Sequence, residues 1–308
     1  MNEFENNEVN NLTSPLVEDA KNNGVALAED AENNGVALAE DVDGAEDVDG
    51  AEDMGSTCVE NALHRIKLVV SYDGTNYHGW QAQPNAVTVE GEVEKALTDL
   101  LGTEMEVIGA SRTDAGVHAQ GNVCVFDTTS RIPAEKFQNA LNARLPEDIR
   151  IVDSCEVDPS FHPRFDAHEK TYEYRITRAK TMIPTKRLYS TLIYYKLDVQ
   201  KMRQAAAFIV GRHDFASFQS TGSTIKDTVR TVFSCDVVEE GADLVIRVRG
   251  DGFLYNMVRI IAGTLINVGS GKMKPEDVKK AVTGRSRQMA GPTAPAKGLT
   301  LIEIEYDE

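Results

Sequence analysis

The chain has 308 residues, and its hydrophobic content of 41% is that of a globular protein with a large core. No apolar run approaches the ~20 residues that cross a bilayer, and no basic and apolar leader is visible, so a cytoplasmic protein without a membrane span is expected. The four cysteines stand far apart with no C-x-x-C pair, which argues against a zinc site and favours reduced thiols.

The net charge of -17 is concentrated in residues 1–57. This stretch holds 16 of the 49 acidic residues and one basic residue, Lys21, for a charge of -15, so the remaining chain carries only -2. Two acidic motifs each occur twice, beginning at Glu18, Glu29, Glu40 and Glu46. Such repeats bury too little surface to offset the entropy of ordering, so a disordered acidic tail is expected. The alternative, a calcium-binding repeat, needs more ligands per loop and glycine at set positions.

Residues 58–165 have the pattern of an α+β half. Strands are expected at residues 65–72, 104–108, 122–126 and 148–157. Helices are expected from Val89 to Leu101, ended by Gly102, and from Pro133 to Pro146. The resulting order, β-α-β-β-α-β, is that of a ferredoxin-like fold.

Residues 166–308 repeat this order. Strands are expected at residues 171–176, 188–195, 228–238, 244–249 and 299–306. Helices are expected after Asp198, from about Tyr255 to Val268, and in a short segment started by Pro275. The sequence therefore predicts an α+β protein of two ferredoxin-like (βαββαβ) halves, with antiparallel sheets packed side by side and an active-site cleft between them.

The least ordinary stretch runs from Gly109 to Ala119 and reads G-A-S-R-T-D-A-G-V-H-A. It places a cation, a carboxylate and an imidazole in a polar loop between two expected strands: Arg112, Asp114 and His118. Loops held by strands are common positions for catalytic groups. The same residues also suit a tight turn in which Asp114 caps backbone amides and pairs with Arg112 at the surface.

R-T-D-A-G-V-H-A resembles the signature loop of the TruA family of tRNA pseudouridine synthases, in which the Asp is catalytic. Other segments are similar to the same family: Tyr72–Gln81, Asn142–Pro146, Phe161–Phe165, Lys170–Tyr174, Gly252–Arg259 and Pro292–Pro295. The resemblance extends from about Arg65 to Tyr306. It does not include the acidic tail, which family members generally lack.

The resemblance implies an isomerase (an intramolecular transferase) that converts uridine to pseudouridine in the anticodon stem-loop, at roughly tRNA positions 38 to 40, recognised by shape. It implies base flipping and no cofactor or metal. Members of the family work as homodimers with tRNA spanning both subunits. The expected partners are therefore tRNA and a second copy of this chain, and no membrane.

The resemblance also assigns roles to individual residues. Asp114 would be the catalytic carboxylate, and Arg259 the guanidinium that keeps it ionised under the bound base. Tyr172 would stack on the target base. Arg112 would occupy the space left by the flipped uridine, and His118 would orient the loop or contact phosphate. Whether the Asp attacks the sugar, adds to uracil or abstracts a sugar proton is left open.

Structural alternatives remain for several of these residues. Tyr172 shares a strand face with Tyr174, so either ring can belong to the core. A satisfied structural histidine is an equal alternative for His118. Ten basic residues are candidates for a tRNA groove, although a solvated strand face explains most of them individually: Lys67, Arg164, Lys170, Arg175, Arg178, Lys186, Arg187, Arg230, Arg247 and Arg249.

Two other functions compete with the synthase. A non-catalytic RNA-binding module would use surface aromatic residues, but it gives no reason for Asp114, Tyr172 and Arg259 to occur together. A carboxylate-based glycosidase normally requires a second acid at a defined separation. Assaying the release of tritium from C5-labelled uridine separates these possibilities.

Overall fold

A mixed sheet of ten strands runs through the computed structural model, which describes residues 62–223 and 225–307. The strand order is β4-β1-β3-β10-β5-β9-β8-β7, while β2 pairs with β3 and β6 pairs with β5. The expected acidic tail at 1–57, and Cys58, lie outside the described residues. The protein therefore has a mixed α+β fold, as predicted, built on one large sheet.

The first half has the predicted β-α-β-β-α-β order. Its elements are β1 (His64–Tyr72), α1 (Val89–Leu101), β2 (Ile108–Gly109), β3 (His118–Thr128), α2 (Phe137–Asn142) and β4 (Ile149–Val157). Helix α1 ends where expected, because Gly102 adopts the left-handed conformation with φ 74°. At its other end, the Thr88 hydroxyl accepts a hydrogen bond from the Gly91 amide.

The strand expected at 104–108 is wrong in its extent, because only its last residue and Gly109 pair with β3. The amide of Val107 instead donates to Glu94 Oε1 on α1, at 3.1 Å. An amide bonded to a helix side chain is not free to join a strand ladder, so β2 begins late.

The second half contains the same order with additions. Its elements are β5 (Ala167–Arg178), β6 (Thr191–Ile193), α3 (Val199–Ala207), β7 (Gly211–Asp214), β8 (Val229–Glu240), β9 (Asp243–Gly250), α4 (Met257–Gly269), α5 (Pro275–Gly284) and β10 (Leu299–Tyr306). The strand expected at 188–195 is shorter in the structure, where it is β6. A 3-10 turn at Pro184–Lys186 comes before it, and the Tyr189 amide still donates a turn hydrogen bond to the Lys186 carbonyl oxygen, so the chain becomes extended only after that residue. Asp198 caps α3 as predicted, accepting from the Lys201 amide.

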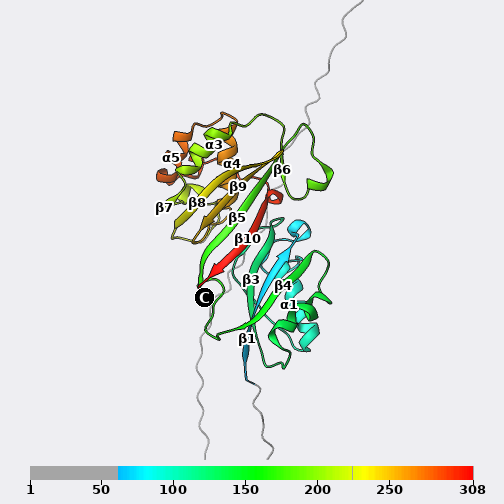
Figure 1. Cartoon of the computed structure of the whole chain (residues 1–308). Helices are drawn as coiled ribbons and strands as arrows, with labels where there is room; N and C mark the ends of the chain where they lie inside the picture. The colour runs from blue at the N-terminus through cyan, green and yellow to red at the C-terminus, as the bar shows by residue number, and fades with distance from the viewer. Residues whose placement is uncertain (1–61, 224, 308) are drawn as a thin grey trace, which may run out of the picture. The chain divides into compact units, whose positions relative to one another are not determined.

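The two halves share one continuous sheet, which corrects the expected pair of sheets packed side by side. Strand β10 pairs antiparallel with β5 and, on its other edge, parallel with β3 (Figure 1). In the parallel pair, Thr300 lies opposite His118 and Leu301 opposite Ala119. Gly121 permits the close approach, because a Cβ there would lie 2.8 Å from the Ile302 carbonyl oxygen.

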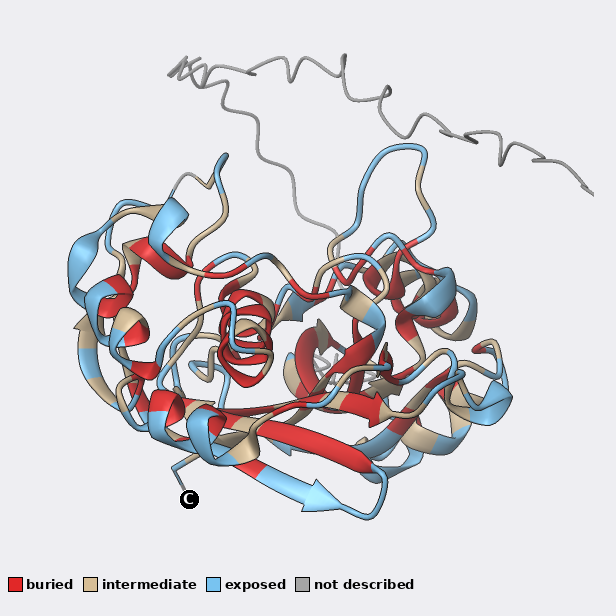
Figure 2. Cartoon of the chain, turned by 90° about the horizontal axis from the view of Figure 1, so that it is seen from above, coloured by how far each residue is buried: buried red, intermediate tan, exposed pale blue. Residues whose placement is uncertain are grey.

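Buried residues from both halves form one hydrophobic core that includes strands and helices alike (Figure 2). Strand β1 alternates buried and partly exposed residues, as period two predicts, whereas α4 buries most of its residues. Cys124 and Cys235 are free and buried in β3 and β8, as expected. Within residues 62–223 and 225–307, no helix has the length and apolar character needed to cross a membrane.

Candidate functional site

The loop between β2 and β3 rests on the segment that follows β1. Gly79 has φ +95° and lies against the loop, so that a Cβ there would be 2.5 Å from the Thr113 carbonyl oxygen. The Trp80 amide donates to that carbonyl at 3.1 Å, and the Tyr72 hydroxyl lies 2.7 Å from the Thr113 hydroxyl. Two segments that resemble the same family in sequence therefore pack on each other.

Asp114 lies on this loop and faces helix α4 of the second half. Arg259 Nη1 donates to Asp114 Oδ2 at 3.0 Å, and both side chains are about four-fifths buried. Burial raises the pKa of the Asp114 carboxyl above its ordinary value, and the hydrogen bond and charge of Arg259 partly oppose this rise. Among the described residues, no ion pair joins Asp114 to Arg112, so the geometry does not support the surface-pair alternative.

Arg259 is held from two further directions. Its Nε donates to the Ala294 carbonyl oxygen at 2.8 Å, and its Nη1 donates to Asn256 Oδ1 at 2.7 Å. Asn256 precedes α4 in the left-handed conformation, with φ 62°, and its Nδ2 donates to Ser220 Oγ at 3.0 Å. The guanidinium is therefore fixed in position before any substrate binds.

Strand β5 places Tyr172 and Tyr174 on one face, and the structure separates their surroundings. Tyr174 is fully buried, and its hydroxyl donates to the Pro295 carbonyl oxygen at 2.9 Å. Tyr172 lines a pocket, with its ring 5.3 Å from that of Phe253 in an edge-to-face arrangement. Burial raises the pKa of Tyr172 to about 12, so its ring is neutral at physiological pH. Both rings therefore pack in the hydrophobic core, and Tyr172 is the one of the two that lines the pocket.

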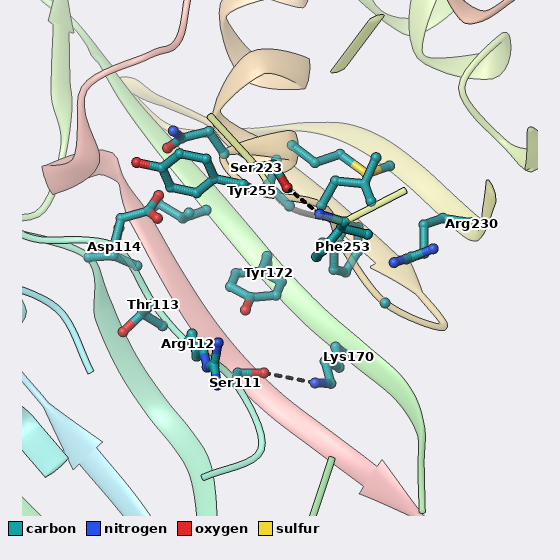
Figure 3. A pocket seen from close by; sticks show the side chains of 18 of the residues that line it. Ser111, Arg112, Thr113, Asp114, Lys170, Tyr172, Ser223, Arg230, Phe253 and Tyr255 are labelled. Carbon is teal, nitrogen blue, oxygen red and sulfur yellow. Dashed lines mark hydrogen bonds between the residues drawn. The ribbon is translucent and has the colours of Figure 1, made fainter. Parts of the chain in front are cut away.

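The pocket encloses about 540 Å³ and takes its lining from both halves. Arg112, Asp114 and Tyr172 all line it, as the resemblance predicts, and Arg259 contacts it through Asp114. In Figure 3, Tyr172 lies between Asp114 on one side and the hydrogen-bonded pair Ser111 and Lys170 on the other. A volume of this size is typical of small-molecule sites.

His118 lies outside the pocket lining and is 4% exposed at the start of β3. Its Nδ1 accepts from the Gly74 amide at 3.1 Å, and its Nε2 is 3.0 Å from the Leu188 carbonyl oxygen. Asp73 Oδ1 also lies 3.1 Å from Nδ1, so both ring nitrogens have partners within the fold. The geometry favours the structural alternative for His118, as a link between the first half and the β5–β6 connection.

The structure divides the ten candidate basic residues. Three line the pocket, namely Arg164, Lys170 and Arg230. Five are engaged by carboxylates: Arg175, Arg178, Lys186, Arg247 and Arg249. The Lys67 ammonium lies 6.0 and 5.8 Å from two aromatic ring centroids, and Arg187 donates to the carbonyl oxygen of Pro184. Most of these ten residues therefore lie on a solvated or ion-paired surface, and the other three line the pocket.

The sequence did not single out several residues of the pocket lining, among them Ser111, Phe253, Tyr255 and Asn256. Ser111 stands within the signature loop, and the other three stand within the segment Gly252–Arg259, so their positions were marked by the resemblance although their roles were not. Among the described residues, no group of three or more His, Cys, Asp or Glu side chains is arranged to hold a metal ion.

Comparisons with known proteins identify relatives of this chain. A family model described as tRNA pseudouridine synthase matches residues 68–166 and 205–307. Over 244 residues the chain is 46% identical to the tRNA pseudouridine synthase A of Acetivibrio thermocellus, covering 79% of this chain and 100% of that protein. It is 47% identical over 245 residues to the protein of the same name from a Thermoanaerobacter species, with the same coverage.

Among solved structures, the chain resembles the archaeal box H/ACA sRNP Nop10-Cbf5 complex at 13% identity and a TM-score of 0.28, covering 77% of this chain and 46% of that one. A global similarity this low adds nothing to the assignment, which rests on the family model and on relatives matched along their whole length. The chain therefore belongs to the TruA family of tRNA pseudouridine synthases, which are isomerases.

Proposed function

We propose that the chain converts uridine to pseudouridine in the anticodon stem-loop of tRNA, at roughly positions 38 to 40, with shape-based recognition of the RNA. One observation carries the proposal: Asp114 lies in a pocket, bonded to a fixed guanidinium and beside the ring of Tyr172. These are the three catalytic residues that the resemblance implies.

The reaction exchanges one bond to ribose for another within the same nucleotide. The N1–C1′ bond breaks, the retained uracil rotates, and C5 bonds to C1′, after which C5 loses its proton and N1 gains one. Such chemistry needs an ionised carboxylate near the sugar and a pocket that retains the free base. Asp114 would be that carboxylate, and Arg259 opposes the tendency of burial to protonate it.

Tyr172 and Arg112 would hold the target nucleotide out of the RNA stack. The Tyr172 face offers a base-stacking surface, which contributes roughly 1–3 kcal/mol in single-stranded RNA complexes. Arg112 comes from the same loop as Asp114 and lines the same pocket, which supports the proposal that it enters the RNA at the vacated position. Extrusion of a base costs a few kcal/mol, which such contacts offset.

The test uses tRNA transcripts labelled with tritium at uracil C5. The proposed function predicts tritium release together with an RNA that gains pseudouridine, and a loss of release when the uridines at positions 38 to 40 are replaced by cytidine. Release of free uracil would identify a glycosidase instead. Tight tRNA binding without tritium release would identify a binding module.

The assembly is also part of the proposal. By resemblance, the chain works as a homodimer with one tRNA contacting both subunits, in the cytoplasm. Light scattering on the purified full-length chain, with and without tRNA, measures the number of copies. A strictly monomeric enzyme with full turnover would contradict this part alone.

A further inference from the structure

One end of the pocket gathers three cations: Arg112, Arg164 and Lys170. Lys170 is 9% exposed, and its Nζ donates to the Ala110 carbonyl oxygen at 2.9 Å and to Ser111 Oγ at 3.0 Å. Both acceptors are neutral. Throughout residues 62–223 and 225–307, no carboxylate forms an ion pair with any of these three cations.

The three cations are close enough to act on one another. Burial, together with the smaller effect of the Arg164 charge, lowers the pKa of Lys170 to about 8. Burial and the charge of Arg112 likewise lower the pKa of Arg164, with Glu90 opposing. Partly buried like charges repel one another and are poorly solvated. The three cations therefore destabilise the folded protein until an anion binds at this end of the pocket.

The carboxylate of Glu90, whose charge acts on Arg112 and Arg164, is already engaged by other donors. The Glu90 carboxylate, itself buried, accepts from Trp80 Nε1 at 3.0 Å, from Gln81 Nε2 at 2.6 Å and from the Ala82 amide at 2.6 Å. These three hydrogen bonds hold the Glu90 carboxylate, on α1, against the loop that precedes the helix. Glu90 therefore moderates the positive potential of the pocket without pairing with its cations.

Strand β5 relates this cationic end to the base-stacking surface. Lys170 and Tyr172 point to the same face two residues apart, which separates their Cα atoms by about 7 Å. Asp114 lies on the other side of Tyr172 (Figure 3). A nucleotide whose base rests on Tyr172 and whose sugar faces Asp114 therefore has room for its phosphate link at the Lys170 end.

We propose that Lys170 and Arg164 form a phosphate subsite that takes a backbone phosphate of the RNA strand beside the flipped nucleotide. An ammonium has three N–H donors, of which two are used by Ala110 and Ser111, so one remains for a phosphate oxygen. The guanidinium of Arg164 supplies the second charged donor. The inference rests on the proposed function, because it requires the RNA to enter this pocket.

The experiment measures the tRNA dissociation constant of the full-length chain across a salt series. Each lost phosphate contact reduces the slope of log affinity against log salt by about one. We expect Lys170→Gln and Arg164→Gln each to weaken binding severalfold at low salt and to reduce the slope by about one, and the double variant by about two. Lys280→Gln is the matched control, because Lys280 is an exposed lysine on α5 outside the pocket, and its slope should equal that of the wild type.

A wild-type slope in both variants would overturn the subsite. A lower melting temperature for Lys170→Gln with an unchanged slope would make Lys170 only a structural tie to the Asp114 loop, and the slope of Arg164→Gln would then decide whether a phosphate binds here. Arg164→Gln is suited to this decision, because among the described residues the Arg164 side chain makes no hydrogen bond or ion pair with the loop. Binding is measured without turnover, so a protein that binds tRNA but releases no C5 tritium would refute the proposed function and still test the subsite.

Discussion

The two halves of the sheet contribute to the pocket in different ways. The first half supplies Asp114 and Arg112 on a loop whose shape depends on backbone contacts, the closest of them at Gly79. The second half supplies Tyr172 and Arg259 from strand β5 and helix α4, where side-chain contacts determine their positions. Asp114 thus sits on an irregular segment, whereas Arg259, which is hydrogen-bonded to it, and Tyr172 sit on regular elements.

The difference indicates how each half tolerates change. A loop shaped by close backbone packing has no rotamer to adjust, so an added methyl group must move the loop itself. A side chain held by three hydrogen bonds can lose one and keep most of its orientation. We therefore expect losses of function to be larger for substitutions in the first half than for comparable substitutions in the second.

The largest effect is expected for Asp114→Asn. Asparagine is nearly isosteric, so the fold and most of the tRNA affinity should persist, but an amide cannot replace the anionic oxygen as nucleophile or base. We expect no detectable pseudouridine after long incubation, with tRNA dissociation constants within about a few-fold of wild type. Melting, gel-shift affinity and C5 tritium release on one preparation check this. Substantial turnover in a verified variant would remove Asp114 from the chemistry.

Gly79→Ala tests the backbone packing directly. The added Cβ meets the Thr113 carbonyl oxygen at 2.5 Å and the residue has φ +95°, so the loop must shift. We expect a stability loss of about 1–3 kcal/mol and a turnover loss on the order of a hundredfold, because catalysis is sensitive to displacements of about 1 Å.

The control for this change is Gly102→Ala, at φ 74° with no atom within 4 Å of the added Cβ. It carries the same kind of backbone strain at the end of α1, where the added Cβ does not touch the loop. Urea unfolding should show a similar order of stability loss, with turnover retained. If Gly102→Ala lowers turnover as much as Gly79→Ala, general destabilisation rather than loop position explains both.

Arg259→Lys is the corresponding change in the second half. Lysine keeps the charge but cannot reach the Ala294 carbonyl, Asn256 and Asp114 together as the planar guanidinium does. We expect turnover to fall roughly tenfold while tRNA affinity changes little. Collapse of affinity with an unchanged single-turnover rate would instead make Arg259 a phosphate contact.

The smallest effect concerns the titration of Asp114. Burial raises the pKa of the Asp114 carboxyl in the folded chain above its ordinary value near 3.8. The contribution of this carboxyl to the free energy of unfolding is therefore greatest below pH 3.8, and it is lost as the pH rises through the pKa of the folded state. Asp114→Asn does not titrate. The melting temperature of the variant relative to wild type should therefore rise between about pH 4 and pH 6. A relative melting temperature that falls over this range would show that Arg259 outweighs burial.

Much of the fold could be predicted because its signals are local. Gly102 ends α1 and Asp198 caps α3 through contacts within a few residues, and strand periodicity located most of the sheet. The expected strand at 104–108 failed because Glu94, distant along the chain, captures the Val107 amide. The joining of two sheets through β10 was also missed, since no local pattern encodes a parallel pair of two residues.

The candidate site likewise combines residues that the sequence points to with contacts that only the folded chain shows. The resemblance named Asp114, Tyr172 and Arg259. In the structure Asp114 and Tyr172 line one pocket and Arg259 is hydrogen-bonded to Asp114, while the roles of all three remain proposals. Asn256 could not be identified as the support of Arg259, because its left-handed backbone is visible only in three dimensions. Likewise, only the structure shows that Lys170 is bonded to neutral acceptors in the pocket, whereas other basic residues of the strands are paired with carboxylates.

The position of β10 has a consequence for synthesis of the protein. Of the described strands it emerges last from the ribosome, yet it occupies the middle of the sheet and supplies the link between β5 and β3. Until it emerges, the nascent chain exposes two unpaired strand edges, which are templates for aggregation. The pocket, whose lining comes from both sides of that link, is complete only once β10 is in place. A ribosome stalled before residue 299 would therefore carry an RNA-modifying enzyme that is not yet able to modify RNA.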